Sequence, residues 1–398
     1  MLTHEKYVII TSDIKSAKSG FYRAKARVAV HRLSENVLTQ KLLPKGKRRR
    51  TAVSVDTDLF YVIINYNKFV YRAGVYVKPK SINSLIKYMR DKKGIAISGS
   101  TQKKKLRYMG YFHGYKGYRY CYSPSSLLPY TGFNELQAVY EFDMGLKAIL
   151  YPQIMFLETT IKNYALENIL KQSGSERFAD IYAKLLNDYK TFPVGTTEYK
   201  KLITKRMNVR NKIYSVISRD YGRNNIVNHY YDKDKAVPIW AIFELLSLGE
   251  FGNFLSCVNV TVRKNISGDV GIKSSVDSDG KMLEKIVYTL KDLRNSVAHN
   301  NTVFDTRFKT GKVNNRISKY IMSELSISNV TFDTIVDYIV LIAFVMSLLK
   351  CPKTQIQQFI HQFEDACDNF RKNVPANIYS KIIYTDTKAK LTGIKNVI

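Results

Sequence analysis

The chain has 398 residues and only four cysteines, and no two of them form a CxxC pair. They are Cys121, Cys257, Cys351 and Cys367. A zinc ribbon needs paired cysteine ligands, and a disulfide-stapled domain needs a dense set of cysteines, so this spacing indicates neither. The sequence therefore predicts a protein that works with reduced thiols and needs no metal or other cofactor.

Long apolar runs are also scarce. The longest, from Tyr338 to Leu349, is shorter than the roughly 20 residues that span a bilayer, and it is typical of a buried helix. The N-terminus, MLTHEKYVIITSD, lacks the basic segment and apolar core of a signal peptide. These absences favour a soluble, cytoplasmic protein.

Acidic residues are few, because 33 Asp and Glu face 63 Lys and Arg, which gives a formal charge of +30 at pH 7. Residues 1–130 carry +21 of this excess and residues 131–398 carry +9. A compact protein with so much charge of one sign repels itself unless an anion binds. The basic first third is therefore predicted to face a polyanion, above all nucleic acid, and a merely basic surface is the alternative.

Changes in residue pattern divide the chain into four regions. Residues 1–77 carry no motif and read as an extension of unknown role, although Leu59 to Val77 has the composition of strands. Residues 78–130 are basic and rich in aromatic side chains. Residues 131–370 show helical spacing throughout, and residues 371–398 form a basic tail. The predicted fold is an all-α bundle with an irregular or small α+β N-terminal region.

Apolar side chains recur every three or four residues along most of the bundle. The spacing from Leu136 to Ile169 predicts one or two long helices, and the polar stretch from Thr191 to Asp234 interrupts the pattern. Pro238 precedes a helix predicted from Trp240 to Leu248 and ended by Gly249. Further helices are expected over Ile82–Met89, Lys281–His299, Ser328–Leu349 and Lys353–Phe370.

Cations alternate with aromatic rings between Lys103 and Tyr122, and a second basic cluster precedes this segment in the chain. Ammonium and guanidinium groups bind phosphates while rings stack on unpaired bases, so the pattern predicts RNA binding. In the alternative interpretation, half of the tyrosines belong to the core and the lysines form a solvated face. The candidate RNA-binding residues are Lys103, Lys104, Lys105, Arg107, Tyr111, Lys116 and Arg119, with Lys47, Arg48, Arg49 and Arg50.

Two of the six histidines follow an arginine at a short interval. His299 follows Arg294 in the sequence RNSVAH, and His229 follows Arg223 in RNNIVNH. His4, His31, His113 and His361 have no acid, base or metal partner at an informative spacing. In a helix, Asn295 and His299 share one face with Asp292 nearby, while Leu293 and Val297 face the core.

Such an edge offers an imidazole, an amide and a guanidinium. If two copies meet across a two-fold axis, one imidazole can take the proton of a ribose 2′-hydroxyl and the other can protonate the leaving 5′-oxygen. Arg294 would hold the phosphate and offset its growing charge, and Asn295 would orient it by hydrogen bonding. An isolated Arg-x4-His pattern also occurs by chance.

The residues around the motif resemble the RN-x-x-AH signature of HEPN ribonucleases and, more specifically, Abi-like proteins of the AbiD/AbiF abortive-infection type. Residues 1–77 have no counterpart in this resemblance, and His229-Tyr230 resembles a recurrent, positional pair. The supporting blocks are Lys78–Gly94, Tyr108–Tyr122, Val139–Lys147 with Phe156–Glu158, Pro238–Gly249 and Arg294–Asn301.

The resemblance implies an all-helical HEPN fold that dimerises to form one composite site. It also implies a metal-independent endoribonuclease that acts as a toxin in anti-phage defence, restrained by a structured non-coding RNA. Arg294, Asn295 and His299 would be catalytic, and Asp143 and Glu158 would support them from a neighbouring helix. Two alternatives stay open: a HEPN-like scaffold that binds RNA without chemistry, and a DNA-binding regulator, for which no helix-turn-helix signature is present.

Overall fold

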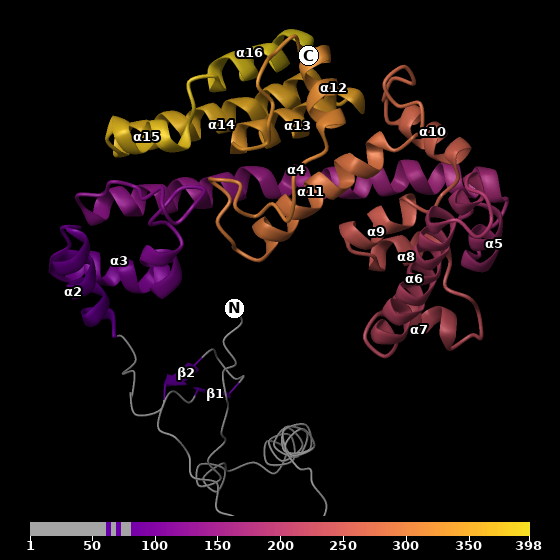
Figure 1. Ribbon diagram of the computed structural model, residues 1–398, viewed down its shortest axis with the longest axis horizontal. Helices are drawn as coiled ribbons and strands as arrows, with labels where there is room; N and C mark the ends of the chain where they lie inside the picture. The colour runs from indigo at the N-terminus through magenta and orange to yellow at the C-terminus, as the bar shows by residue number, and fades with distance from the viewer. Residues whose placement is uncertain (1–60, 65–68, 73–80) are drawn as a thin grey trace, which may run out of the picture. The chain divides into compact units, whose positions relative to one another are not determined.

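The structure is a computed structural model that describes residues 61–64, 69–72 and 81–398 (Figure 1). Contacts divide the chain into two units, Met1–Ser81 and Ile82–Ile398. In the first unit, β1 (Tyr61–Ile64) and β2 (Phe69–Arg72) pair antiparallel. Strands therefore do occur within the segment with strand-like composition. The predicted basic cluster from Lys47 to Arg50 lies outside the described residues.

The second unit is built from helices, which confirms the predicted all-α body. None of the helices in the described ranges combines the length and apolar character needed to cross a membrane. In chain order the helices are α2 (Ile82–Lys93), α3 (Gly99–Tyr111), η2 (Phe112–Lys116), α4 (Phe133–Ser173), α5 (Phe178–Lys184), η3 (Asp188–Thr191), α6 (Thr197–Asp220), α7 (Asn225–Tyr231), α8 (Ile239–Leu245), α9 (Leu248–Leu255), α10 (Val260–Asp269), α11 (Met282–Ala298), α12 (Asn315–Leu325), α13 (Ile335–Leu348), α14 (Lys353–Asn373), α15 (Ala376–Ile382) and α16 (Thr387–Val397).

Helix α4 is the spine of this unit and runs for 41 residues, so the two predicted stretches form one helix (Figure 1). Its first turn is capped by Glu135, whose carboxylate accepts the backbone N–H groups of Thr131 and Gly132. It ends at Gly174, which adopts the left-handed conformation that glycine tolerates best. Helices α10, α11, α13 and α14 all pack on α4.

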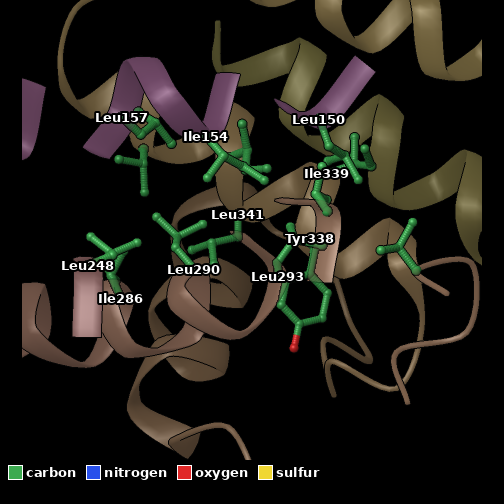
Figure 2. Close-up of a cluster of buried hydrophobic side chains, with 14 of the residues drawn as sticks. Leu150, Ile154, Leu157, Leu248, Ile286, Leu290, Leu293, Tyr338, Ile339 and Leu341 are labelled. Carbon is green, nitrogen blue, oxygen red and sulfur yellow. The ribbon is translucent and has the colours of Figure 1, made fainter. Parts of the chain in front are cut away.

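The core beside α4 fixes the rotation of α11 about its own axis. Figure 2 shows side chains of α4 and α11 meeting one another and those of α9 and α13. Ile286, Leu290 and Leu293 recur at helical spacing on α11 and are all at most 1% exposed. Because this face is buried, the neighbouring positions Arg294 and Asn295 lie at its margin. The labelled residues are Leu150, Ile154, Leu157, Leu248, Ile286, Leu290, Leu293, Tyr338, Ile339 and Leu341.

The helix predicted from Trp240 to Leu248 is divided by a local helix cap. Helix α8 ends at Leu245, and Ser247 begins α9 with a capping box in which its hydroxyl accepts Glu250 N–H and the Glu250 carboxylate accepts Ser247 N–H. Gly249 therefore lies inside a helix and does not end one.

Two more predicted boundaries were wrong. The polar stretch from Thr191 to Asp234 contains α6 and α7, because four apolar residues of α6 suffice to bury one side of a helix that is otherwise highly charged. The segment from Ser328 becomes helical only at Ile335, since Asn329 and Phe332 adopt left-handed backbone conformations that a helix excludes.

The last 28 residues do not form the expected tail, because α15 and α16 pack on the bundle. Lys390 of α16 is buried, and its ammonium lies 2.8 Å from Asp337 of α13 and 3.0 Å from Asp386. A basic residue in this segment is thus neutralised inside the fold, where a removed partner would leave a costly unpaired charge.

Candidate active site

The sequence RNSVAH occupies the last turn of α11 and the residue after it. Helix α11 ends at Ala298, and the His299 N–H donates to the Asn295 carbonyl at 3.0 Å. Asn300 then turns the chain with a positive φ of 53°. The His299 side chain is exposed, and Arg294 and Asn295 are half-buried. The three predicted catalytic residues therefore share one edge that is open to solvent.

Arg294 is held by a buried carboxylate of α4. Its Nε atom lies 3.2 Å from Oε2 of Glu158, whose Oε1 lies 2.9 Å from Nζ of Lys162. Lys162 also donates to the Leu246 carbonyl at 2.8 Å, which ties the cluster to the end of α8. Within the described part of the chain, the terminal Nη1 and Nη2 of Arg294 have no hydrogen-bond partner. Glu158 thus orients the guanidinium while its outer edge stays available.

Asp143, one turn of α4 nearer the N-terminus than Lys147, fixes the chain that follows His299. This fully buried carboxylate accepts the backbone N–H groups of Val303 and Phe304 at 2.7 and 2.8 Å. It also accepts the Tyr118 hydroxyl at 2.7 Å and pairs with Lys147 at 2.7 Å. The two residues expected to support the site therefore act on both sides of it, Glu158 on the arginine and Asp143 on the loop.

Lys147 connects this carboxylate to the residue after His299. Its Nζ donates to Oδ1 of Asn300 at 2.8 Å, although its side chain is only 7% exposed. Such charge-assisted hydrogen bonds are stronger than neutral ones. The resemblance gave Lys147 only as a motif position, and nothing in the sequence links it to Asn300, which is 153 residues away.

Asn295 and His299 keep their side chains free. Neither the amide nor the imidazole has a hydrogen-bond partner among residues 81–398. Asp292, expected near them, is instead engaged by the backbone N–H and hydroxyl of Thr310 and by Lys291. A bound substrate could therefore contact the Asn295 amide, the His299 imidazole and the outer edge of the Arg294 guanidinium without displacing an existing hydrogen bond.

The basic aromatic segment divides between core and surface. Tyr115 and Tyr118 are buried, which is two of the six tyrosines in this segment, where the alternative interpretation expected half. Tyr108, Tyr111 and Phe112 are exposed by 72%, 38% and 53% and lie along α3 and η2. Among the predicted RNA-binding residues, Lys104, Lys105, Arg107 and Lys116 are exposed, whereas Lys103 and Arg119 are half-buried.

Two of the exposed rings, those of Tyr108 and Tyr111, lie close to lysine ammonium groups. The ammonium of Lys116 lies 4.9 Å from the centre of the Tyr111 ring, and that of Lys104 lies 5.8 Å from the Tyr108 ring. These are cation–π distances. The structure therefore places positive charge and aromatic faces together on the surface of α3 and η2.

His113 joins this segment to the site, although its sequence neighbours gave no sign of it. Its Nδ1 lies 3.5 Å from the hydroxyl of Tyr118, which donates to Asp143. Burial, and after it the charge of Lys147, lowers the pKa of His113 from its ordinary value. The neutral form of the imidazole is thus favoured beside the cluster that positions the loop after His299.

His229 is not part of this arrangement. It is exposed on α7, and its ring packs edge-on against Tyr230, whose ring lies 6.2 Å from Trp240. The positional role of His229 therefore stays a prediction. In the described ranges no three His, Cys, Asp or Glu side chains gather to hold a metal ion.

Residues 104–305 match the profile of the protein family described as Abi-like protein. The match covers slightly more than half of the chain, from within α3 to the loop after α11, and includes Asp143, Glu158, Arg294 and His299. No curated protein and no solved structure matches the chain significantly.

Proposed function

The chain belongs to the Abi-like protein family, and from this premise we propose that it is an endoribonuclease toxin of an abortive-infection system. Membership of the family associates the chain with abortive-infection defence. The proposal adds three features to that association: a HEPN-type site that works without metal, a homodimer, and restraint of the toxin in the cytoplasm by a structured non-coding RNA.

One observation carries the proposal. The buried Glu158 fixes Arg294 through Nε and leaves its Nη edge free, next to an unpartnered Asn295 amide and an exposed His299 imidazole. A free guanidinium edge can hold a phosphate through two parallel hydrogen bonds. Preorganised donors of this kind stabilise charge that develops in a transition state, because they need no reorganisation when the reaction occurs.

The chemistry requires a base, an acid and a phosphate clamp. One His299 takes the proton of the 2′-hydroxyl as its oxygen attacks phosphorus, and the His299 of the second copy gives a proton to the 5′-oxygen as the P–O5′ bond breaks. The products are a 2′,3′-cyclic phosphate and a 5′-hydroxyl. Arg294 binds the non-bridging oxygens, and Asn295 orients the phosphate.

Beside this edge, helix α4 has an uncharged face that a second copy of the chain can approach. Between Met144 and Thr159, the only charged residues of α4 are Lys147 and Glu158, and both are buried. The exposed side chains there include Tyr151 at 47% and Phe156 at 36%. In a chain with a formal charge of +30, such a face allows two copies to meet without strong repulsion.

The first test asks whether the wild-type protein is a catalyst. Incubation of labelled single-stranded RNA with the purified chain in EDTA is expected to give fragments that end in 2′,3′-cyclic phosphate and begin with 5′-hydroxyl. The reason is that imidazole and guanidinium groups suffice for attack by the 2′-hydroxyl. Electrophoresis with end-specific phosphatase and kinase treatment identifies the ends. Intact RNA, or cleavage that EDTA abolishes, would contradict the proposal.

Binding of RNA without chemistry is the second candidate, and the exposed rings and cations of α3 and η2 favour it. That surface needs neither Arg294 nor His299 to hold a polyanion. In this case the EDTA incubation leaves the RNA intact, and substitution of His299 changes affinity only. The two candidates therefore differ in one measurement.

The α3 surface also gives a prediction for the restraining RNA. The Lys104→Gln/Lys105→Gln variant is expected to bind structured RNA more weakly, and its plot of log affinity against log salt should be shallower by nearly two, at about 0.9 per lost phosphate contact. Filter binding at several salt concentrations measures both quantities. The control removes two exposed lysines from α14, as Lys353→Gln/Lys372→Gln. An equal change in both variants would show that only the net charge matters.

A further inference from the structure

A cavity of about 690 Å³ opens between α12, the loop from Lys309 to Val313 and the segment from Val330 to Asp333. Its wall carries three lysines against a single carboxylate, Asp333. Lys309 pairs with that carboxylate at 2.7 Å. The cavity therefore keeps an excess of two positive charges.

The other two lysines of the wall are available to a ligand. Lys312 and Lys319 are exposed, and neither forms an ion pair or a hydrogen bond with any residue in the described ranges. Lys312 lies in the loop before α12, where the positive end of the helix dipole adds to its charge, and Lys319 is the fifth residue of that helix. The cavity is thus complementary to an anion by side-chain charge first and by backbone dipole second.

The lining of the cavity also has an apolar part. Val330 is 3% exposed, and Val313 and Met322 are half-buried against the core. A volume of this size fits a group as large as a nucleotide, since ligand cavities commonly span roughly 300–1,000 Å³. Cations beside an apolar surface are the combination that binds the phosphate and the base of an unpaired nucleotide.

The cavity is tied to the candidate active site through Thr310, which is part of its lining. Thr310 donates its backbone N–H and its hydroxyl to Asp292 of α11. Asp292 precedes His299 by seven residues, which corresponds to about 10 Å along the helix axis. Positions 292, 295 and 299 follow one face of α11, so Thr310 brings one wall of the cavity to the same face of α11 as the imidazole.

We propose that this cavity is a subsite for the RNA substrate, in which Lys312 and Lys319 bind the phosphate of an unpaired nucleotide flanking the cleaved bond and Val313, Met322 and Val330 contact its base. The inference rests on the proposed function, because it assigns the cavity to the substrate of that site. It accounts for two unpaired lysines beside half-buried apolar side chains in a region with no part in the reaction itself.

The test measures binding of a single-stranded oligoribonucleotide whose 2′-oxygens are methylated, which the proposed reaction is unable to cleave. The Lys312→Gln/Lys319→Gln variant of the full chain is expected to bind this probe about tenfold more weakly than the wild type. Its salt dependence should be shallower by about 1.4, at roughly 0.7 per lost phosphate contact on a single strand. Fluorescence anisotropy at several salt concentrations gives both values.

The matched control, Lys353→Gln/Lys372→Gln, removes the same charge from exposed positions on α14 and should bind the probe as the wild type does. Equal affinity of the wild type and the cavity variant would overturn the subsite even if the protein cleaves RNA. A specific loss in the cavity variant would support an RNA site even if no cleavage is found. The two proposals thus fail separately.

Competition separates a nucleotide subsite from a general anion site. An aspartate-rich peptide with the same number of charges is expected to displace the probe from the wild type at least tenfold less well than unlabelled probe does. Equal displacement would overturn the assignment to RNA, because charge alone would then explain occupancy of the cavity.

Discussion

The His299→Ala protein is expected to fold and to bind RNA but to cleave it about a hundredfold to ten-thousandfold more slowly than the wild type. A positioned acid or base contributes this range of rate, and the proposed reaction uses His299 in both roles. The side chain is exposed and makes no hydrogen bond within residues 81–398, so its loss should change the free energy of unfolding by less than about 0.5 kcal/mol. Single-turnover cleavage of labelled RNA measures the rate.

The Arg294→Ala protein should lose cleavage to a similar extent for a different reason. It keeps the general base but no longer neutralises the charge on the phosphate, and removal of one such donor costs about a hundredfold to a thousandfold. Arg294→Lys should recover little, because an ammonium lacks the two parallel donors of the guanidinium. Glu158 keeps its contact with Lys162 in both variants, so its buried charge stays paired.

The matched control for these variants is His361→Ala, which removes an exposed histidine of α14 that pairs with Glu364. It should cleave RNA at the wild-type rate. The His299→Ala, Arg294→Ala and His361→Ala proteins should all sediment as dimers, since none of the substituted residues lies on the uncharged face of α4. Wild-type cleavage by His299→Ala or Arg294→Ala would refute the assignment of the site, and a monomeric wild type would refute its composite form.

The helices that the sequence predicted well are those whose buried apolar residues recur every three or four positions. Helices α4, α11 and α14 follow their periodicity, and Leu293 and Val297 are buried as expected from their spacing. The stripe determines which side of a helix meets the core, and so it also places Arg294 and Asn295 at the margin of that side. This part of the site follows from the sequence alone.

Other elements depend on contacts that periodicity does not contain. Helix α6 buries Val209, Ile213, Val216 and Ile217 among many lysines and arginines, so its average polarity hides it. The break between α8 and α9 follows from one reciprocal cap, Ser247 with Glu250. From the sequence, Lys390 is expected at the surface, but the fold buries it between two carboxylate partners.

The contacts that organise the site also depend on the tertiary fold, which periodicity does not contain. Glu158 precedes Arg294 by 136 residues, and Asp143 precedes Val303 by 160. No local pattern measures such a separation, and only the order of the family motifs placed both carboxylates with the site. The same limit explains Asp292, which shares a helix face with His299 but is occupied by Thr310 from a later loop.

The Asp143→Ala protein is expected to show the largest loss of stability, roughly 3–5 kcal/mol, because the substitution leaves a buried ammonium without its counter-charge. Lys147 is 7% exposed and lies 2.7 Å from this carboxylate. The Tyr118 hydroxyl and the N–H groups of Val303 and Phe304 lose their acceptor as well. For a unit that runs from Ile82 to Ile398 the thermal midpoint should fall by roughly 5–8 °C, as followed by circular dichroism.

Two companion variants show whether charge or hydrogen bonding dominates. Tyr118→Phe removes one donor and should cost only about 1 kcal/mol, whereas Asp143→Asn keeps an acceptor oxygen but no charge and should lie between the two. Glu141→Ala, on the same helix but exposed, should differ from the wild type by less than about 0.5 kcal/mol. If Asp143→Ala unfolds like Glu141→Ala, the carboxylate does not hold the loop after His299. If Asp143→Asn costs as much as Asp143→Ala, the unpaired charge of Lys147 accounts for most of the lost stability, and the site is held chiefly by that ion pair.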